Sequence, residues 1–94
     1  MRLPSLTSKK MVRALERAGF VKDRQKGSHL IMINPKNNAR TVVPIHQGKT
    51  LKRPLVHAII DDARLSPEEF LKSLWYFLIG ILRNEKVFEF LENV

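Results

Sequence analysis

The sequence contains no cysteine, and this absence excludes several kinds of site. Without thiols the chain has no disulfide framework, no thiolate zinc site, no iron–sulfur cluster and no cysteine nucleophile. Long apolar runs are also missing, because the longest one, residues 74–82, has nine residues and a membrane-spanning helix needs about 20. The first residues do not fit the pattern of a secretory signal. We therefore expect a cytoplasmic protein that does not enter a membrane.

Acidic residues are scarce in the first part of the chain. Residues 1–54 hold 13 lysines and arginines against only Glu16 and Asp23, a net charge of 13 − 2 = +11. Residues 55–94 hold 4 basic and 7 acidic residues, a net charge of 4 − 7 = −3, which gives the total of +8. Strongly basic segments are typical of proteins that bind anionic partners. We therefore expect an anionic partner to bind residues 1–54.

Aromatic residues are scarce in the same basic part. Only Phe20 lies within residues 1–54, and the other six aromatic residues all follow residue 69. Proteins that bind single strands by stacking bases interleave aromatic residues with cations. This chain lacks that pattern, which favours contacts with the phosphate backbone and with helix shape over base stacking.

The length and the hydrophobic content together predict one folded domain. The chain has 94 residues, of which 44% are hydrophobic. Independent domains mostly have about 50 to 200 residues, and this hydrophobic content is enough for a buried core. We therefore expect a single compact domain without global disorder.

Apolar periodicity predicts a helix over about residues 8–18, with Thr7 or Ser8 as its N-cap and Gly19 as its stop. Three strand candidates follow, residues 20–24, 28–34 and 40–45, with a hairpin loop at residues 25–27 and a turn at residues 35–38. Short loops between consecutive strands predict an antiparallel meander. The second strand is apolar on both faces, so we expect helices on one face and the tail or a partner on the other.

Two further helices follow the strands. Pro54 suits the first turn of one helix, and the sequence SPEE at residues 66–69 is a capping box that begins another. From Trp75 to Ile79 this last helix is apolar all round, so we expect it to be buried on more than one side, by its own domain or by a second copy.

The first helix carries a row of cations on its exposed side. Lys9, Arg13 and Arg17 are spaced at i, i+4 and i+8, and Lys10 lies beside them. Like charges at this spacing repel each other by a few tenths of a kcal/mol, roughly, and a bound phosphate relieves that repulsion. An ordinary solvated face explains the row equally well, so both interpretations remain open.

Two short motifs carry a resemblance to a known family. They are RQKGSH at residues 24–29 and VPIHQGK at residues 43–49, and they follow a helix that ends in RAGF at residues 17–20. In this order, over about residues 5–72, the sequence resembles the HicA family of bacterial type II toxins, also called YcfA-like proteins. The chain departs from the family pattern at KRP, residues 52–54, and at ARLS, residues 63–66.

The resemblance implies a fold, an activity and a partner. Family members have a fold similar to double-stranded-RNA-binding domains, cut mRNA without a metal, and are neutralised by an antitoxin of the HicB family. We therefore expect an α+β fold with an α-β-β-β-α core, a three-stranded antiparallel sheet and a C-terminal helical extension. The expected division is a HicA-like toxin domain at residues 1–72 and an apolar helical extension at residues 73–94, packed on that domain or on a partner.

The resemblance also implies a catalytic residue. His29 occupies the position of the family's catalytic histidine, after Gly27 and Ser28, which also match. RNA supplies its own nucleophile, the 2′-hydroxyl, so cleavage needs a base, an acid and cations. Histidine suits the proton transfers because its ordinary pKa, about 6.5, lies near operating pH. The alternative for His29 is a partly buried strand residue with no chemistry.

Other residues around His29 are candidates for binding RNA. Arg24, Lys26 and Lys49 are able to supply a cationic clamp for the phosphate. His46 is a second proton-transfer group, a phosphate contact or simply part of a loop, and these three interpretations remain open. The complete set of expected RNA-binding residues is Lys9, Lys10, Arg13, Arg17, Arg24, Lys26, Ser28, His46 and Lys49.

The sequence favours neither a metal site nor a cofactor site. Its three histidines are too few and do not have the spacing of known ligand sets. Asp61 and Asp62 are adjacent on a helix and so point in different directions, which disfavours a shared metal. There is no Walker motif and no dinucleotide fingerprint. His57 has no polar cluster beside it, and we expect it to be structural or exposed to solvent.

We therefore expect a metal-independent endoribonuclease, the toxin of a toxin–antitoxin pair, whose partners are mRNA and a HicB-like antitoxin. Two alternatives remain. One is a non-catalytic RNA-binding module with the same fold, and the other is an interaction protein that forms a homodimer through its apolar tail.

Overall fold

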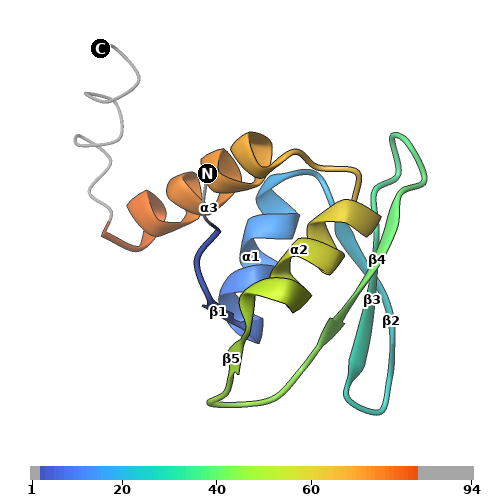
Figure 1. The fold of residues 1–94 in the computed structure, drawn as a ribbon. Helices are drawn as coiled ribbons and strands as arrows, with labels where there is room; N and C mark the ends of the chain where they lie inside the picture. Colours follow the sequence, from blue (N-terminus) through green and yellow to red (C-terminus); the bar gives the residue numbers. More distant parts are fainter. Residues whose placement is uncertain (1–2, 83–94) are drawn as a thin grey trace.

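The structure is a computed structural model, and it describes residues 3–82 (Figure 1). Residues 83–94 of the expected C-terminal extension lie outside the described residues. The elements, in chain order, are β1 (Leu6–Thr7), α1 (Ser8–Arg17), β2 (Val21–Lys26), β3 (His29–Ile33), β4 (Arg40–Pro44), β5 (Thr50–Leu51), α2 (Arg53–Asp62) and α3 (Pro67–Leu82).

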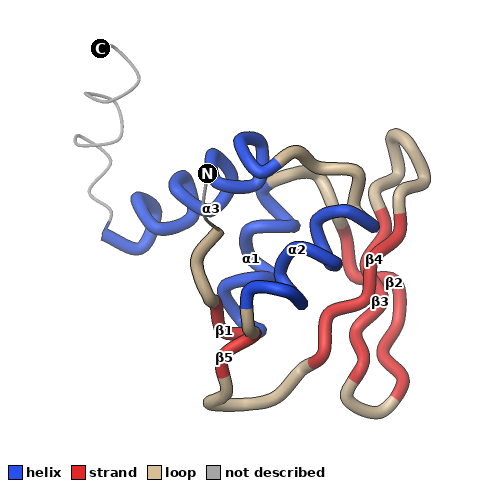
Figure 2. Tube along the Cα trace, viewed as in Figure 1, coloured by secondary structure: helices blue, strands red, loops and turns tan. Residues whose placement is uncertain are grey.

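The main sheet is an antiparallel meander with the order β2-β3-β4, as the short loops predict. The helices before and after it complete the α1-β2-β3-β4-α2 core, and α3 is a further helix on its C-terminal side (Figure 2). This confirms the expected α+β fold. The structure adds one feature that the sequence analysis lacks, a short antiparallel pairing of β1 with β5 that joins the start of α1 to the start of α2.

The hairpin loop between β2 and β3 is shorter than predicted. Lys26 pairs with His29, so Gln25 and Lys26 belong to β2 and the loop consists of Gly27 and Ser28. Gly27 has a φ of +57°, and Ser28 is not among the residues with positive φ. A two-residue loop with glycine first matches the right-handed twist of the strands. The prediction of a loop at residues 25–27 was therefore wrong, because the pairing of β2 with β3 continues up to Lys26 and His29.

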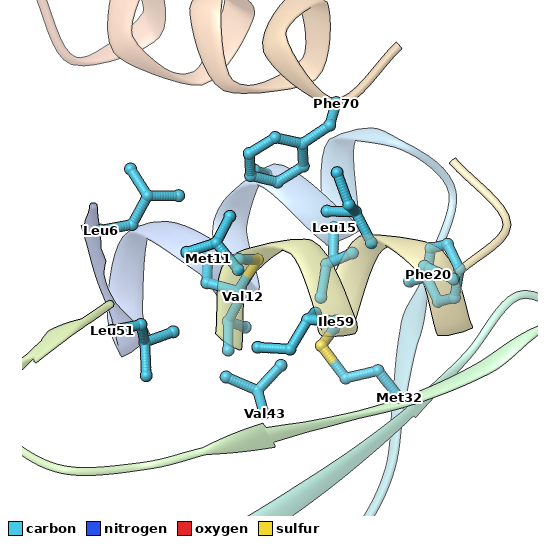
Figure 3. Packing of buried hydrophobic residues seen from close by; sticks show 14 of the residues in the cluster. Leu6, Met11, Val12, Leu15, Phe20, Met32, Val43, Leu51, Ile59 and Phe70 are labelled. Atoms are coloured by element: carbon cyan, nitrogen blue, oxygen red, sulfur yellow. The ribbon is translucent and has the colours of Figure 1, made fainter. Parts of the chain in front are cut away.

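The core lies between the sheet and the helices, and α3 covers the side of α1 that faces away from the sheet (Figure 3). Met32 and Val43 enter from the sheet, Met11 and Ile59 from α1 and α2, and Phe70 from α3; all five are at most 2% exposed. Burying side chains of this size contributes about 1.5–3 kcal/mol each. The first turn of α3 is therefore part of the same core as the α1-β2-β3-β4-α2 unit.

No described helix covers the outer face of the sheet, which we call the open face. All described helices lie on the other side (Figure 1), and Val21 and Val42 on the outer face are 47% and 40% exposed. The described part of the tail does not cover this face, because α3 packs on α1. A covering partner is not tested by the structure.

The capping box at the start of α3 forms as predicted. The Glu69 backbone N–H donates to Ser66 Oγ at 3.1 Å, and the Ser66 N–H donates to the Glu69 carboxylate at 3.0 Å. Further along α3, Leu74 and Ile79 are each 6% exposed, whereas Trp75 is 59% exposed. Within the described chain, Trp75 is therefore not covered by its own domain, and burial of this side by a second copy stays a prediction.

Candidate active site

His29 is the first residue of β3, directly after the two-residue loop, and its side chain is exposed. Its cross-strand neighbours are Lys26 on β2 and Pro44 on β4. Directly paired side chains in an antiparallel sheet lie on the same face, and the next residue of β3, Leu30, is buried on the helix side. His29 and Lys26 therefore lie side by side on the open face.

The loop at residues 45–49 meets the same end of the sheet. The Ile45 N–H donates to the Ser28 carbonyl at 2.6 Å, which ties the loop to the hairpin turn. Ser8 Oγ donates to the Pro44 carbonyl at 2.6 Å, and the His46 N–H donates to Ser8 Oγ at 3.3 Å. Ser8 is only 4% exposed. The start of α1, the hairpin turn and this loop are thus fixed to one another around His29.

A β-bulge distributes the cations of β2 over both faces of the sheet. Strict alternation would place Lys22, Arg24 and Lys26 on one face. The register instead shifts between Lys22 and Arg24, so Lys22 pairs with the buried Met32 and Arg24 pairs with Ile31. Lys22 therefore points to the helix side, while Arg24 and Lys26 point to the open face with His29.

On the helix side, a groove of about 580 Å³ runs between α1, the inner face of β2 and the loop after β4. Lys9 and Arg13 line it from α1, Lys22 from β2 and His46 from the loop. Val12, Leu30 and Ile45 form its apolar part. The groove also contains one acidic side chain, Glu16, whose carboxylate lies 3.5 Å from the Arg13 guanidinium.

The expected RNA-binding residues therefore fall into separate groups. Lys9, Arg13 and His46 line the groove, whereas Arg24, Lys26 and His29 share the open face. Ser28 contributes its carbonyl to the contact between the turn and the loop. Lys10 and Lys49 are exposed, and neither lines the groove. The single basic surface that the charge distribution suggests is thus two surfaces that meet at β2.

Arg17 belongs to neither group. Its guanidinium carbon lies 5.9 Å from the centre of the Tyr76 ring on α3. A cation over an aromatic face at this distance is attracted to the ring. Arg17 therefore contacts α3, one turn beyond the cations that line the groove.

Sequence reasoning missed several residues that the structure brings to the site. Lys22 and Gln25 line the groove, and the side on which Lys22 lies depends on the bulge, for which the sequence gives no signal. Ser8 was considered only as an N-cap, yet the cap is Thr7, whose hydroxyl accepts from the Lys10 N–H at 3.2 Å. The hydroxyl of Ser8 therefore hydrogen-bonds to the last residue of β4 and to the loop that follows it.

Within residues 3–82, no group of three or more histidine, aspartate or glutamate side chains is arranged to hold a metal ion. Over the same residues, none of the helices combines the length and the apolar character that crossing a membrane requires.

The fold and the site place the protein in the class of α+β domains with a double-stranded-RNA-binding-domain-like fold. The family model for the HicA toxin of bacterial toxin–antitoxin systems matches residues 8–65. The chain therefore belongs to the HicA toxin family, which is the toxin side of a toxin–antitoxin pair. A comparison with curated proteins found no match. The matched range contains α1 to α2 with both motifs, and α3 begins two residues after it.

Proposed function

We propose that this HicA-family protein is a metal-independent endoribonuclease that cuts mRNA, with His29 as the catalytic residue. The observation that carries the proposal is the placement of His29. It is an exposed side chain at the end of a hairpin, beside Lys26, in a chain of a toxin family. Exposure leaves the imidazole accessible to RNA, which a proton-transfer role requires.

The proposed RNA cleavage uses only the 2′-hydroxyl of the RNA and side chains of this protein. The 2′-hydroxyl oxygen of RNA forms a bond to the adjacent phosphorus while the bond from phosphorus to the 5′-oxygen breaks. One proton leaves the 2′-hydroxyl and one reaches the departing 5′-oxygen, and His29 carries out one of these transfers. Lys26 and Arg24 on the same face stabilise the negative charge that builds up on the phosphate.

His46 is the candidate for the second proton transfer. The turn–loop contact between Ser28 and Ile45 brings its loop to the end of the sheet where His29 lies. The His46 side chain also lines the groove on the helix side. The position of the loop agrees with the second proton transfer, and the position of the side chain in the groove agrees with contact to a neighbouring phosphate.

For a partner, we propose a HicB-like antitoxin of acidic character. The open face of the sheet offers three cations, Arg24, Lys26 and Arg40, around the apolar side chains of Ile31 and Val42. An acidic protein with apolar contact residues is complementary to that face, and it would compete with RNA for His29.

A second copy of the chain is the alternative partner, and the exposure of Trp75 favours it. Trp75 is 59% exposed and belongs to the apolar run at residues 74–82, and exposed apolar patches mark interaction sites. If α3 pairs with a second α3, Trp75→Glu converts a dimer into a monomer, as measured by mass in solution. A wild-type monomer would exclude this partner.

The test of the activity is direct. Purified protein should cut a single-stranded mRNA fragment in the presence of EDTA, and the same fragment with 2′-O-methyl groups should stay intact because its nucleophile is blocked. Binding without any cleavage would instead support the non-catalytic RNA-binding module. Cleavage of the methylated RNA would exclude the 2′-hydroxyl mechanism.

A further inference from the structure

The groove between α1 and β2 has the chemical character of a nucleotide site. Three cations line it, Lys9, Arg13 and Lys22, against one carboxylate, Glu16. The apolar side chains of Val12, Leu30 and Ile45 line the same groove. A volume near 580 Å³ falls within the range of about 300–1,000 Å³ that is typical of small-molecule sites. Cations suit a phosphate, and apolar lining residues suit a sugar and base.

The groove and His29 lie on opposite sides of a single pair of strands. Gln25 and Leu30 pair and belong to the groove, and the next pair, Lys26 and His29, belongs to the open face. Consecutive Cα atoms are about 3.8 Å apart, so the two surfaces are separated by one residue along each strand. Because β2 is an edge strand of the sheet, a ligand is able to pass over it from one surface to the other.

The bulge in β2 makes that edge cationic on both sides. Without the register shift, Lys22 would join Arg24 and Lys26 on the open face, and the inner wall of the groove would lose the cation that the sheet contributes to it. With the shift, a polyanion that crosses β2 meets a positive charge before the edge, at Lys22, and again after it, at Arg24 and Lys26.

We infer that the groove binds one unpaired RNA nucleotide next to the phosphate that is cut, with the RNA strand passing over β2 from the groove to His29. The inference rests on the proposed ribonuclease function only for the position of the cut. The affinity of the groove for RNA is a separate property that is measured without cleavage.

The experiment uses the full chain with His29→Ala as the parent, so that RNA is bound but not cut. The affinity for a short fluorescein-labelled single-stranded RNA is measured by fluorescence anisotropy at several salt concentrations. Adding Lys22→Ala should weaken binding about fivefold and lower the slope of log affinity against log salt by about 0.7, the loss of one phosphate contact on a single strand.

A second variant predicts a gain. Glu16→Gln removes the negative charge that the groove contains and frees Arg13 from its ion pair, so it should strengthen RNA binding about two- to fivefold. Damaged folding would weaken RNA binding, so it does not explain an increase in affinity.

The matched controls lie on α3, away from the groove. Lys72→Ala and Glu68→Gln make the same changes in net charge at exposed positions, and each should change the affinity by less than about twofold. If the groove variants and their controls shift the affinity equally, only net charge matters and the inference is wrong. Unchanged RNA affinity in both groove variants also overturns it.

Two further outcomes separate the possible failures. If Lys22→Ala weakens binding of an acidic polyglutamate peptide but not of RNA, the groove is a protein-binding site and the inference is wrong. If the groove variants alter RNA affinity as expected but the wild-type protein never cuts RNA, the groove inference stands and the ribonuclease proposal fails.

Discussion

Ser8 shows how much of the candidate site depends on a single hydroxyl. Its hydroxyl donates to the Pro44 carbonyl and accepts from the His46 N–H, so it links the start of α1 to the end of β4 and to the loop that follows. The residue is almost fully buried. Because water does not replace these bonds easily, the position of His46 relative to the hairpin depends on Ser8.

Ser8→Ala should therefore destabilise the fold and weaken the site together. Leaving a carbonyl and an N–H without their partner should lower the free energy of unfolding by about 1–2 kcal/mol, as measured by chemical denaturation. Ser5→Ala, at an exposed position three residues earlier, should have almost no effect. Equal stability of the two variants would show that the Ser8 bonds contribute nothing.

The roles of individual residues were predictable only in part. His29 was predicted from its motif, and the structure places it exposed at the start of a strand, while its catalytic role stays a prediction. Ser8 and Lys22 were not found. The partners of Ser8 lie 36 and 38 residues away, and the direction of Lys22 is reversed by a bulge that local patterning does not reveal.

Helix α3 begins at a capping box that the four residues SPEE made visible in the sequence. The Ser66 backbone N–H and hydroxyl both hydrogen-bond to Glu69, and these bonds lower the pKa of the Glu69 carboxyl below its ordinary value. A lowered pKa means that the charged form is favoured in the folded protein. The contribution of Glu69 to stability is therefore present above the ordinary pKa of glutamate and is lost as the pH falls through the lowered value.

Ser66→Ala should move the pKa of Glu69 up towards the ordinary glutamate value, because the hydroxyl is removed and the cap that holds the carboxylate against the backbone N–H frays. Carboxyl NMR titration of Glu69 measures this shift. Ser73→Ala on the same helix lies outside the cap and should leave the titration unchanged. An ordinary pKa for Glu69 in the wild-type protein would mean that the capping box does not form in solution.

Helices were easier to predict than the ends of strands. Periodicity and caps predicted α1 to within one residue of Ser8–Arg17, since both signals are local. The hairpin differed because Gln25 and Lys26, which have ordinary loop chemistry, are held in β2 by pairing with Leu30 and His29. Register depends on the partner strand, so the sequence of β2 alone does not determine where it ends.

For the whole molecule, the first question is whether α3 belongs to the domain that the family model covers. Phe70 is fully buried and lies between α3 and the other helices (Figure 3). This packing predicts that α3 and the α1-β2-β3-β4-α2 core unfold together, although the matched range ends at residue 65.

Phe70→Ala should lower the free energy of unfolding by about 3–5 kcal/mol, the usual cost of such a cavity. Denaturation is followed by the fluorescence of Trp75, the single tryptophan, which lies on α3, and by circular dichroism of the whole chain. Both signals should shift together. Leu55→Ala, at a position that is 37% exposed, should cost at most about 1 kcal/mol. Two separate transitions would show that α3 folds independently.

The net charge of the molecule was predictable from the sequence, but the distribution of the cations over the folded surface was not. The sequence assigned a net charge of 13 − 2 = +11 to residues 1–54 and predicted that an anionic partner binds there. In the folded chain the cations divide between the groove and the open face of the sheet, because one side of β2 borders the groove beside α1 and no described helix lies over the other side. Only the three-dimensional pairing of β2 with β3 determines this division.

The most direct measurement compares RNA cleavage by two histidine variants in EDTA. His29→Ala should reduce the initial rate on single-stranded mRNA at least about 100-fold, the low end for loss of a proton-transfer group, with nearly unchanged stability and RNA affinity. His57→Ala, at an exposed position on α2, should cut RNA at the wild-type rate. If His29→Ala still cuts RNA as fast as the wild-type protein, His29 is not the catalytic residue.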